Sequence, residues 1–244
     1  LPPNPTPQHL IILTALEEMI RERKPSSSPS SSPSLPSPNE YFAAIMTALE
    51  AKDQSHTPEL VCLLDAVMGH VDKAILRGKC KSISAVLTLL LKTNLEHEMT
   101  AFVRDLVACL GKLLLAQEVS SAAWSSPGLL KTFFGLLSCF REKRPKVRKA
   151  AMQATVELLR LHVGKKVWVL GKQVTDFSVN VLEACTASDC VPTLHLLGFL
   201  QEALPLLPEE GIKKLAERLL ALQGLDNTLV LQASLHALRA LVKA

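Results

Sequence analysis

Leucine-rich segments with helical spacing follow one another along almost the whole of this chain, separated by short turns that often contain proline. Apolar residues that recur three and four positions apart lie on one face of an α-helix, so each segment predicts a helix with one buried side. Leucine fills 46 of the 244 positions, whereas aromatic residues make up only 4%. Strands are enriched in aromatic and β-branched residues, so this composition favours helices. The chain is therefore predicted to be all-α.

Prolines and one polar motif mark where several of these helices begin. Proline lacks an N–H group, which is no loss in the first turn of a helix. Five prolines fit that position: Pro58, Pro127, Pro145, Pro192 and Pro208. Pro205 falls late in an apolar helix and should end or kink it. Ser37 and Glu40 have the spacing of a capping box, in which each side chain bonds the backbone N–H of the other at a helix start.

These marks divide the chain into about eleven predicted helices joined by short loops. The expected spans are 8–23, 39–52, 58–70, 72–93, 97–117, 127–141, 145–162, 172–187, 190–206, 208–222 and 227–243. Short loops make successive helices antiparallel neighbours. The stretch 24–38 is almost pure serine and proline and has too little apolar area to offset its ordering entropy, so we predict a disordered loop inserted between two helices.

Three of the predicted helices share one pattern, with apolar residues at relative positions 0, 9 and 12 and a small residue at position 4. The pattern occurs at Val147/Ala151/Val156/Leu159, at Leu194/Gly198/Ala203/Leu206 and at Leu229/Ala233/Leu238/Leu241. The offsets average 41 residues, which is the period of HEAT and armadillo repeats. We therefore predict an ARM/HEAT-type α–α superhelix, with residues 1–244 as one solenoid fragment, in preference to an irregular helical bundle. The small residue should let a partner helix approach closely.

The cysteine content and the hydropathy of the chain indicate in which cellular compartment the protein is expected. The six cysteines lie in apolar helical contexts and are too dilute for a disulfide scaffold, which predicts a reducing compartment, cytosol or nucleus. No stretch reaches 18 uninterrupted apolar residues, so no membrane span and no membrane partner are expected. The first residue is leucine rather than methionine, and we expect the chain to be a fragment of something longer.

No known catalytic motif occurs in the sequence. Phosphate-loop, dinucleotide-binding, zincin and nucleophile-elbow patterns are all missing, so we expect no enzyme activity, no cofactor and no small-molecule substrate. Cys185, Cys190 and His195 have a metal-like spacing. A structural zinc site takes four ligands, and we favour buried reduced thiols over a metal.

The sharpest local feature is a basic segment at 141–149, which contributes +5 to a total net charge of +4. Its cations are Arg141, Lys143, Arg144, Lys146, Arg148 and Lys149. A weaker cluster follows at Lys165, Lys166 and Lys172, and another lies at Lys73, Arg77, Lys79 and Lys81. We predict that the 141–149 turn, together with Lys165 and Lys166, binds phosphate groups of RNA or an acidic partner.

Two simpler interpretations of these basic clusters are alternatives to a binding site. In the first, the cations lie on solvated turns and bind nothing. In the second, Arg148 is structural and pairs with an acidic turn residue such as Asp189. Because aromatic residues are few, any RNA contact should involve backbone and shape rather than base stacking.

Three blocks of sequence resemble one family in combination. They are Asn39–Ala51, Arg144–Ala151 and Thr193–Leu197 with the leucine- and proline-rich stretch to Pro208. In this order and separation they are similar to the N-terminal portion of the ribosomal RNA processing protein 12 family, eukaryotic ribosome-biogenesis factors built of ARM/HEAT repeats. The serine- and proline-rich loop resembles an expansion of a shorter family loop.

The resemblance implies a non-catalytic scaffold of the nucleus and nucleolus. Family members associate with small-subunit precursor particles, take part in pre-rRNA processing and subunit export, and are linked to RNA and to the Ran GTPase. The expected partners are thus pre-ribosomal RNA and ribosomal or assembly proteins. The alternative is a transport-receptor-like solenoid that binds protein cargo or Ran GTPase.

Overall fold

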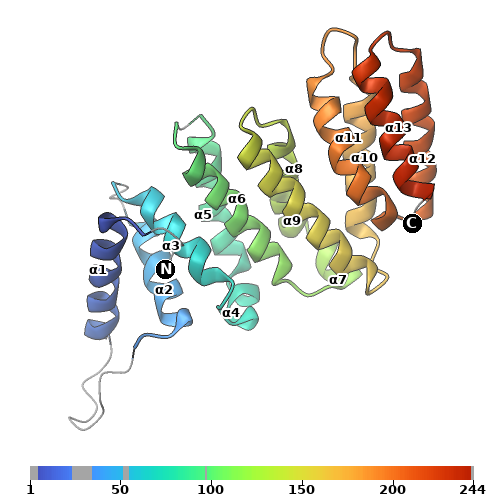
Figure 1. The fold of residues 1–244 in the computed structure, drawn as a ribbon. Coiled ribbons are helices and arrows are strands. Elements are labelled where there is room, and N and C mark those ends of the chain that lie inside the picture. Colours follow the sequence, from blue (N-terminus) through green and yellow to red (C-terminus); the bar gives the residue numbers. More distant parts are fainter. Residues whose placement is uncertain (1–4, 24–34, 52–54, 97, 243–244) are drawn as a thin grey trace. The chain divides into compact units, whose positions relative to one another are not determined.

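The computed structural model describes residues 5–23, 35–51, 55–96 and 98–242, and all regular structure in these ranges is helical (Figure 1). The elements are α1 (Pro7–Arg23), α2 (Pro38–Glu50), α3 (Thr57–Met68), α4 (Lys73–Gly78), α5 (Cys80–Asn94), α6 (Thr100–Leu115), α7 (Ser121–Trp124), α8 (Pro127–Ser138), η1 (Cys139–Arg141), α9 (Pro145–Val163), α10 (Val169–Glu183), α11 (Val191–Ala203), η2 (Leu204–Leu206), α12 (Glu209–Ala221), η3 (Leu222–Gly224) and α13 (Thr228–Val242). The all-α prediction is confirmed.

Each of the eleven predicted helices has a counterpart, with two differences. The span 72–93 is divided into α4 and α5, and α4 ends at Gly78, a residue with low helix propensity. The second difference is α7, which the sequence did not predict because four residues are too few to show an apolar period. Its start is marked by Ser120, whose side chain accepts a hydrogen bond from the backbone N–H of Ala123.

The chain forms two compact units, Leu1–Gln117 and Glu118–Ala244. In the first, α3 packs on both α2 and α6, α5 packs on α6, and α1 covers α2 and α3. In the second, α10 packs on α12 and α11 on α13, while α9 contacts α8, α10 and α11. The single solenoid over 1–244 stays a prediction. The loop predicted at 24–38 falls mostly on residues 24–34, which lie outside the described residues, and Pro38 is already the first residue of α2.

The helix starts marked by the capping box and by four prolines are confirmed, and a fifth proline lies one position earlier than predicted. The backbone N–H of Ser37 donates to Oε2 of Glu40 at 2.7 Å, and the N–H of Glu40 donates to Oγ of Ser37 at 3.3 Å, which confirms the capping box. Four prolines occupy the first turn of a helix: Pro58, Pro127, Pro145 and Pro192. Pro208 lies one position earlier, as the N-cap of α12. Pro205 lies in η2, directly after α11 has ended.

The predicted repeat pattern has the correct register only in α9. Val147, Ala151, Val156 and Leu159 are all buried there. In α13, by contrast, Leu229 is 61% exposed.

In both α11 and α13 a hydroxyl side chain next to a predicted apolar or small position is buried in its place. In α11 Thr193 is buried rather than Leu194, and in α13 Ser234 is buried rather than Ala233. Each hydroxyl donates to a backbone carbonyl, Thr193 to Val181 at 3.4 Å and Ser234 to Leu231 at 2.8 Å. A hydrogen-bonded hydroxyl group can be buried at little cost in free energy. Because it is polar, a pattern of apolar residues does not include it.

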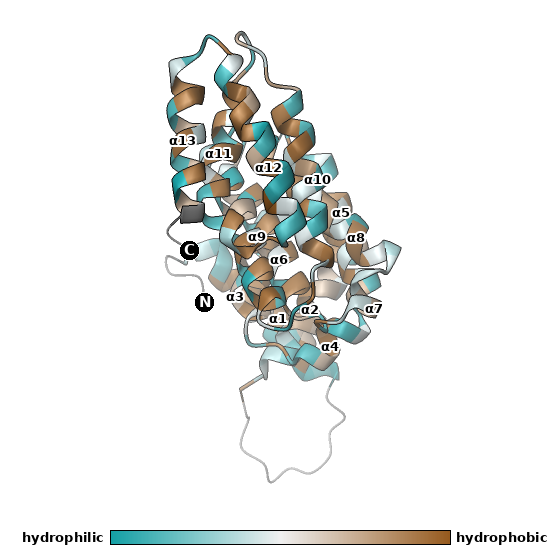
Figure 2. Cartoon of the chain, turned by 90° about the vertical axis from the view of Figure 1, so that its right-hand side faces the viewer, coloured by the Kyte–Doolittle hydropathy of each residue, from teal (hydrophilic) through white to brown (hydrophobic). Residues whose placement is uncertain are grey.

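Most helices are amphipathic rather than apolar all round. In Figure 2 the side of α12 that faces the viewer is largely hydrophilic, while Gly211, Leu215 and Leu219 are buried. Two exposed i,i+4 ion pairs, Glu209–Lys213 and Glu210–Lys214, lie along the same helix. Among the described residues no helix combines the length and the apolar character that crossing a membrane requires.

Candidate anion-binding surface

The basic segment lies at the turn between η1 and α9, and buried side chains hold both ends of this turn. Phe140 packs edge-on against Phe199, with ring centroids 4.8 Å apart, and against Phe177 at 5.6 Å. Val147 is completely buried in the first turn of α9. The charged residues between these two anchors are therefore confined to the surface of the unit Glu118–Ala244.

Arg144 is balanced by its neighbour Glu142. Nε of Arg144 lies 3.0 Å from Oε1 of Glu142, and the side chains are only 19% and 13% exposed. The hydrogen bond from Arg144 lowers the pKa of Glu142, against the opposing effect of partial burial. This pair adds no net charge to the surface.

Arg148 closes the turn. Its Nη1 donates to the backbone carbonyl of Glu142 at 2.6 Å and to that of Lys143 at 3.2 Å. The structural role considered for Arg148 is thus present, but it acts through these carbonyls and not through Asp189. The guanidinium keeps its full positive charge at a fixed position, because carbonyl groups solvate a cation without neutralising it.

Four cations remain exposed around the turn, and we call them the basic turn: Arg141, Lys143, Lys146 and Lys149. Within the described residues none of the four lies within ion-pair distance of a carboxylate. Lys146 and Lys149 sit near the N-terminus of α9, whose first turn carries no acidic residue. The helix dipole is positive at that end and disfavours these lysines, so a bound anion would relieve the repulsion.

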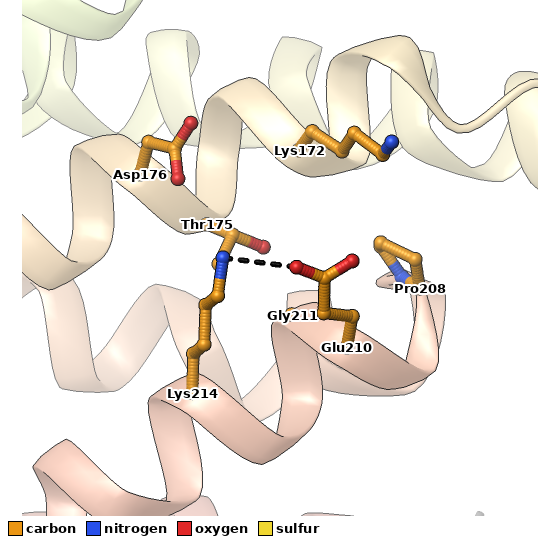
Figure 3. A pocket seen from close by; sticks show the side chains of 7 residues that line it. All are labelled: Lys172, Thr175, Asp176, Pro208, Glu210, Gly211 and Lys214. Atoms are coloured by element: carbon orange, nitrogen blue, oxygen red, sulfur yellow. Dashed lines mark ion pairs between the residues drawn. The ribbon is translucent and has the colours of Figure 1, made fainter.

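Lys165 and Lys166 are not brought together with the basic turn. They follow the C-terminus of α9, and 19 residues of α-helix separate the two ends by about 28 Å. Lys172 was grouped with them by sequence, but it lies beside Glu210, whose carboxylate also pairs with Lys214 at 3.1 Å (Figure 3). The negative charge of Glu210 therefore offsets part of the positive charge of Lys172 and Lys214.

The cluster around Arg77 is also partly structural. Nε of Arg77 donates to the carbonyl of Ala116, the C-cap residue of α6, at 2.8 Å. A cation is favourable at the carbonyl end of a helix. Two of the three basic clusters therefore contain an arginine that binds backbone carbonyls.

Comparison with known proteins identifies the family. Residues 4–244 match the family described as RRP12-like, N-terminal HEAT repeats. The chain belongs to the RRP12-like family. This membership confirms the resemblance found in the three sequence blocks and the helical-repeat fold predicted from the period.

Curated relatives carry the same name. The RRP12-like protein of Gallus gallus is 32% identical over 217 residues, which cover 84% of this chain and 16% of the relative. The human RRP12-like protein is 29% identical over 212 residues, with the same coverage. That of Drosophila melanogaster is 30% identical over 146 residues, 59% of this chain and 10% of the relative. The RRP12-like chain thus spans 16% of the length of the first two.

The cysteines of this RRP12-like chain show no metal-like arrangement. Among the described residues no three histidine, cysteine or acidic side chains come together in a group that could hold a metal ion. Cys190 instead accepts a hydrogen bond from Nδ2 of Asn227 at 3.3 Å. Burial raises the pKa of Cys109 and of Cys139, the latter to about 11, so these two thiols stay protonated and unreactive at neutral pH.

Lys166 offers a test of the turn after α9. It has a φ of 55°, the only positive φ among the non-glycine residues that the structure describes. The N–H of Val167 reaches the carbonyl of His162 at 3.0 Å, as in a Schellman motif, in which glycine usually takes the left-handed position. Replacing Lys166 with glycine should raise the free energy of unfolding by about 1 kcal/mol in urea titrations. Lys165→Gly is the matched control, and an equal gain there would contradict the assignment of strain to Lys166.

Proposed function

We propose that this member of the RRP12-like family acts as a helical-repeat scaffold in ribosome biogenesis. In this role it contributes to pre-rRNA processing, to assembly of the small-subunit precursor and to nuclear export of the subunit. Its partners are pre-ribosomal RNA and ribosomal or assembly proteins, and it works in the nucleus and nucleolus, with shuttling to the cytoplasm. The family name and the helical-repeat fold support a binding role rather than a catalytic one.

The observation that carries the proposal is the uncompensated charge of the basic turn. Four exposed cations gather at one helix N-terminus, whereas the rest of the chain is close to neutral. Such a cluster suits phosphate oxygens of an RNA backbone. Arg144 and Arg148 keep the turn in shape, so in this proposal they position the contact residues and do not themselves supply the main contacts.

The test is a charge reversal of the four cations of the basic turn to glutamate, with Arg144 and Arg148 left in place. Affinity for a short single-stranded RNA should fall at least about tenfold, and the slope of log K against log salt should become shallower by up to about 3, since each lost phosphate contact removes about 0.7. Fluorescence anisotropy over a salt series measures both quantities. In cells, the variant should co-sediment less with small-subunit precursors.

The control variant carries the same change in charge at dispersed positions. Lys79, Lys92, Lys131 and Arg239 are all exposed and lie on different elements or turns. If this control weakens RNA binding as much as the basic-turn variant, the effect is one of net charge, and the basic turn is not a contact site.

The alternative function is a transport-receptor-like solenoid that binds Ran GTPase or protein cargo. It is favoured by large apolar side chains that α13 leaves in solvent, Leu229 at 61% and Leu235 at 40% exposed. Binding through such helix faces should depend little on salt. A Ran GTPase affinity that stays constant over the same salt series, with RNA binding absent, would support this function over the first.

A further inference from the structure

An open groove of about 410 Å³ lies between α9 and α11. Val156 from one helix and Leu194 and Phe199 from the other provide apolar lining, while Arg148 and Lys149 stand at the end near the start of α9. All of these residues belong to the unit Glu118–Ala244. The groove is therefore a feature of one compact body.

Gly198 has no side chain and therefore leaves an unfilled space in the middle of the groove. The sequence predicted a close helix approach at this small residue, but Gly198 is exposed, and a Cβ atom added to it would meet nothing within 4 Å. A glycine inside a helix costs stability relative to alanine, and here no neighbouring helix uses the space that it leaves. The space is available to a side chain from outside the described residues.

The two ends of the groove differ in charge. Neither Arg148 nor Lys149 pairs with a carboxylate of the described residues, and Arg148 is held in place by two backbone carbonyls. At the other end Glu202 is paired with Arg160 at 3.5 Å. Burial, and then the nearby Arg148, lower the pKa of His195, so this lining residue is neutral at pH 7. Among the residues that line the groove, positive charge is thus confined to one end.

We propose that the groove between α9 and α11 binds a protein segment that combines apolar side chains with an acidic residue. An apolar side chain would fill the space over Gly198, and a carboxylate would meet Arg148 and Lys149. RNA fits this lining poorly, because the middle is apolar and its aromatic ring, Phe199, is buried and offers no face for stacking. The groove shares Lys149 with the basic turn, but Arg141, Lys143 and Lys146 do not line it, so variants at these three residues separate RNA binding from peptide binding.

The test selects random short peptides for binding to the 244-residue chain, with counter-selection on the variant Gly198→Leu, whose side chain fills the groove. Enriched peptides should share aspartate or glutamate next to leucine, isoleucine, methionine or phenylalanine. Titration of an enriched peptide should give at least about tenfold weaker binding to Gly198→Leu, which is the scale expected when a buried apolar contact is lost. Lys149→Glu, a change at an exposed side chain, should also weaken binding.

The matched control is Gly135→Leu. Gly135 lies inside α8, and a Cβ there would likewise meet nothing within 4 Å, but it does not line the groove. Peptide binding to this control should equal that to the unchanged chain, with helix content verified for every variant by circular dichroism.

Three results would overturn the proposal. The first is that no peptide is enriched, and the second is that the enriched peptides lack acidic residues or bind Gly198→Leu as tightly as the unchanged chain. The third is that a short single-stranded RNA loses affinity for Gly198→Leu but not for Gly135→Leu, which would assign the groove to RNA.

Discussion

Replacing Trp124 with alanine is expected to lower the free energy of unfolding of the unit Glu118–Ala244 by about 4 kcal/mol. Trp124 is completely buried. Its ring packs edge-on against Phe133, with centroids 6.3 Å apart, and against His162 at 4.8 Å. Its indole N–H donates to the carbonyl of Glu118 at 3.0 Å. The substitution removes these contacts together and leaves a cavity that the neighbouring rings cannot close.

The contact with His162 adds to this effect because that ring is also buried. Nδ1 of His162 lies 2.7 Å from the carbonyl of Leu158 and so carries the proton that it donates. Burial lowers the pKa of His162, which is therefore neutral at pH 7. A cavity beside it would admit water to an imidazole that now rests on an aromatic ring.

Urea denaturation followed by circular dichroism measures the Trp124 effect. Trp168, the other tryptophan of the chain, belongs to the same unit and remains as a fluorescent reporter. The control is Trp168→Ala, a change at a side chain that is 37% exposed, which should cost less than about 1.5 kcal/mol. Equal losses in the two variants would show that Trp124 is not a central core residue.

Replacing Gly211 with alanine is expected to lower the free energy of unfolding by about 2 kcal/mol, although alanine is the better helix former. Gly211 lies in α12 where it crosses α10 (Figure 3). An added Cβ would overlap sterically with Oγ1 of Thr175. That hydroxyl cannot turn away freely, because it donates to the carbonyl of Gly171 at 2.9 Å in a buried position.

The same interface contains a second close approach. A Cβ on Gly171 would come within 2.7 Å of Cδ of Pro208. One glycine on each helix thus allows α10 and α12 to pack closely, and neither helix can move away from one contact without disturbing the other.

A double-mutant cycle tests the proposed overlap. Thr175→Ala alone should cost about 1 kcal/mol through its lost hydrogen bond, and adding it to Gly211→Ala should cost less than the two single losses together. Gly135→Ala, at a helix position with free space around its Cβ, is the control and should not destabilise the unit. Strict additivity of the Gly211 and Thr175 effects would contradict the overlap.

The candidate site was predicted only in part. The sequence located the basic segment 141–149, because a cluster of six cations within nine residues is visible in the sequence itself. It did not reveal that Arg144 pairs with Glu142 or that Arg148 binds two carbonyls, since a count of charges contains no distances. It also joined Lys165 and Lys166 to the turn, although the length of α9 keeps them apart.

The groove beside α9 was missed for a related reason. It depends on which face of α11 is buried, and there Thr193, whose hydroxyl is hydrogen-bonded, is buried in place of Leu194. On this helix Gly198 faces open space instead of a partner helix.

The all-α class, most helix boundaries and family membership thus follow from the sequence alone, because caps, prolines and apolar spacing act within a few residues of one another. Which face of a helix is buried, which cations stay free, and where two glycines allow close packing are decided by tertiary structure. These properties depend on atoms from helices far apart in sequence, such as Thr175 and Gly211, and on buried polar groups whose partners a linear pattern does not contain.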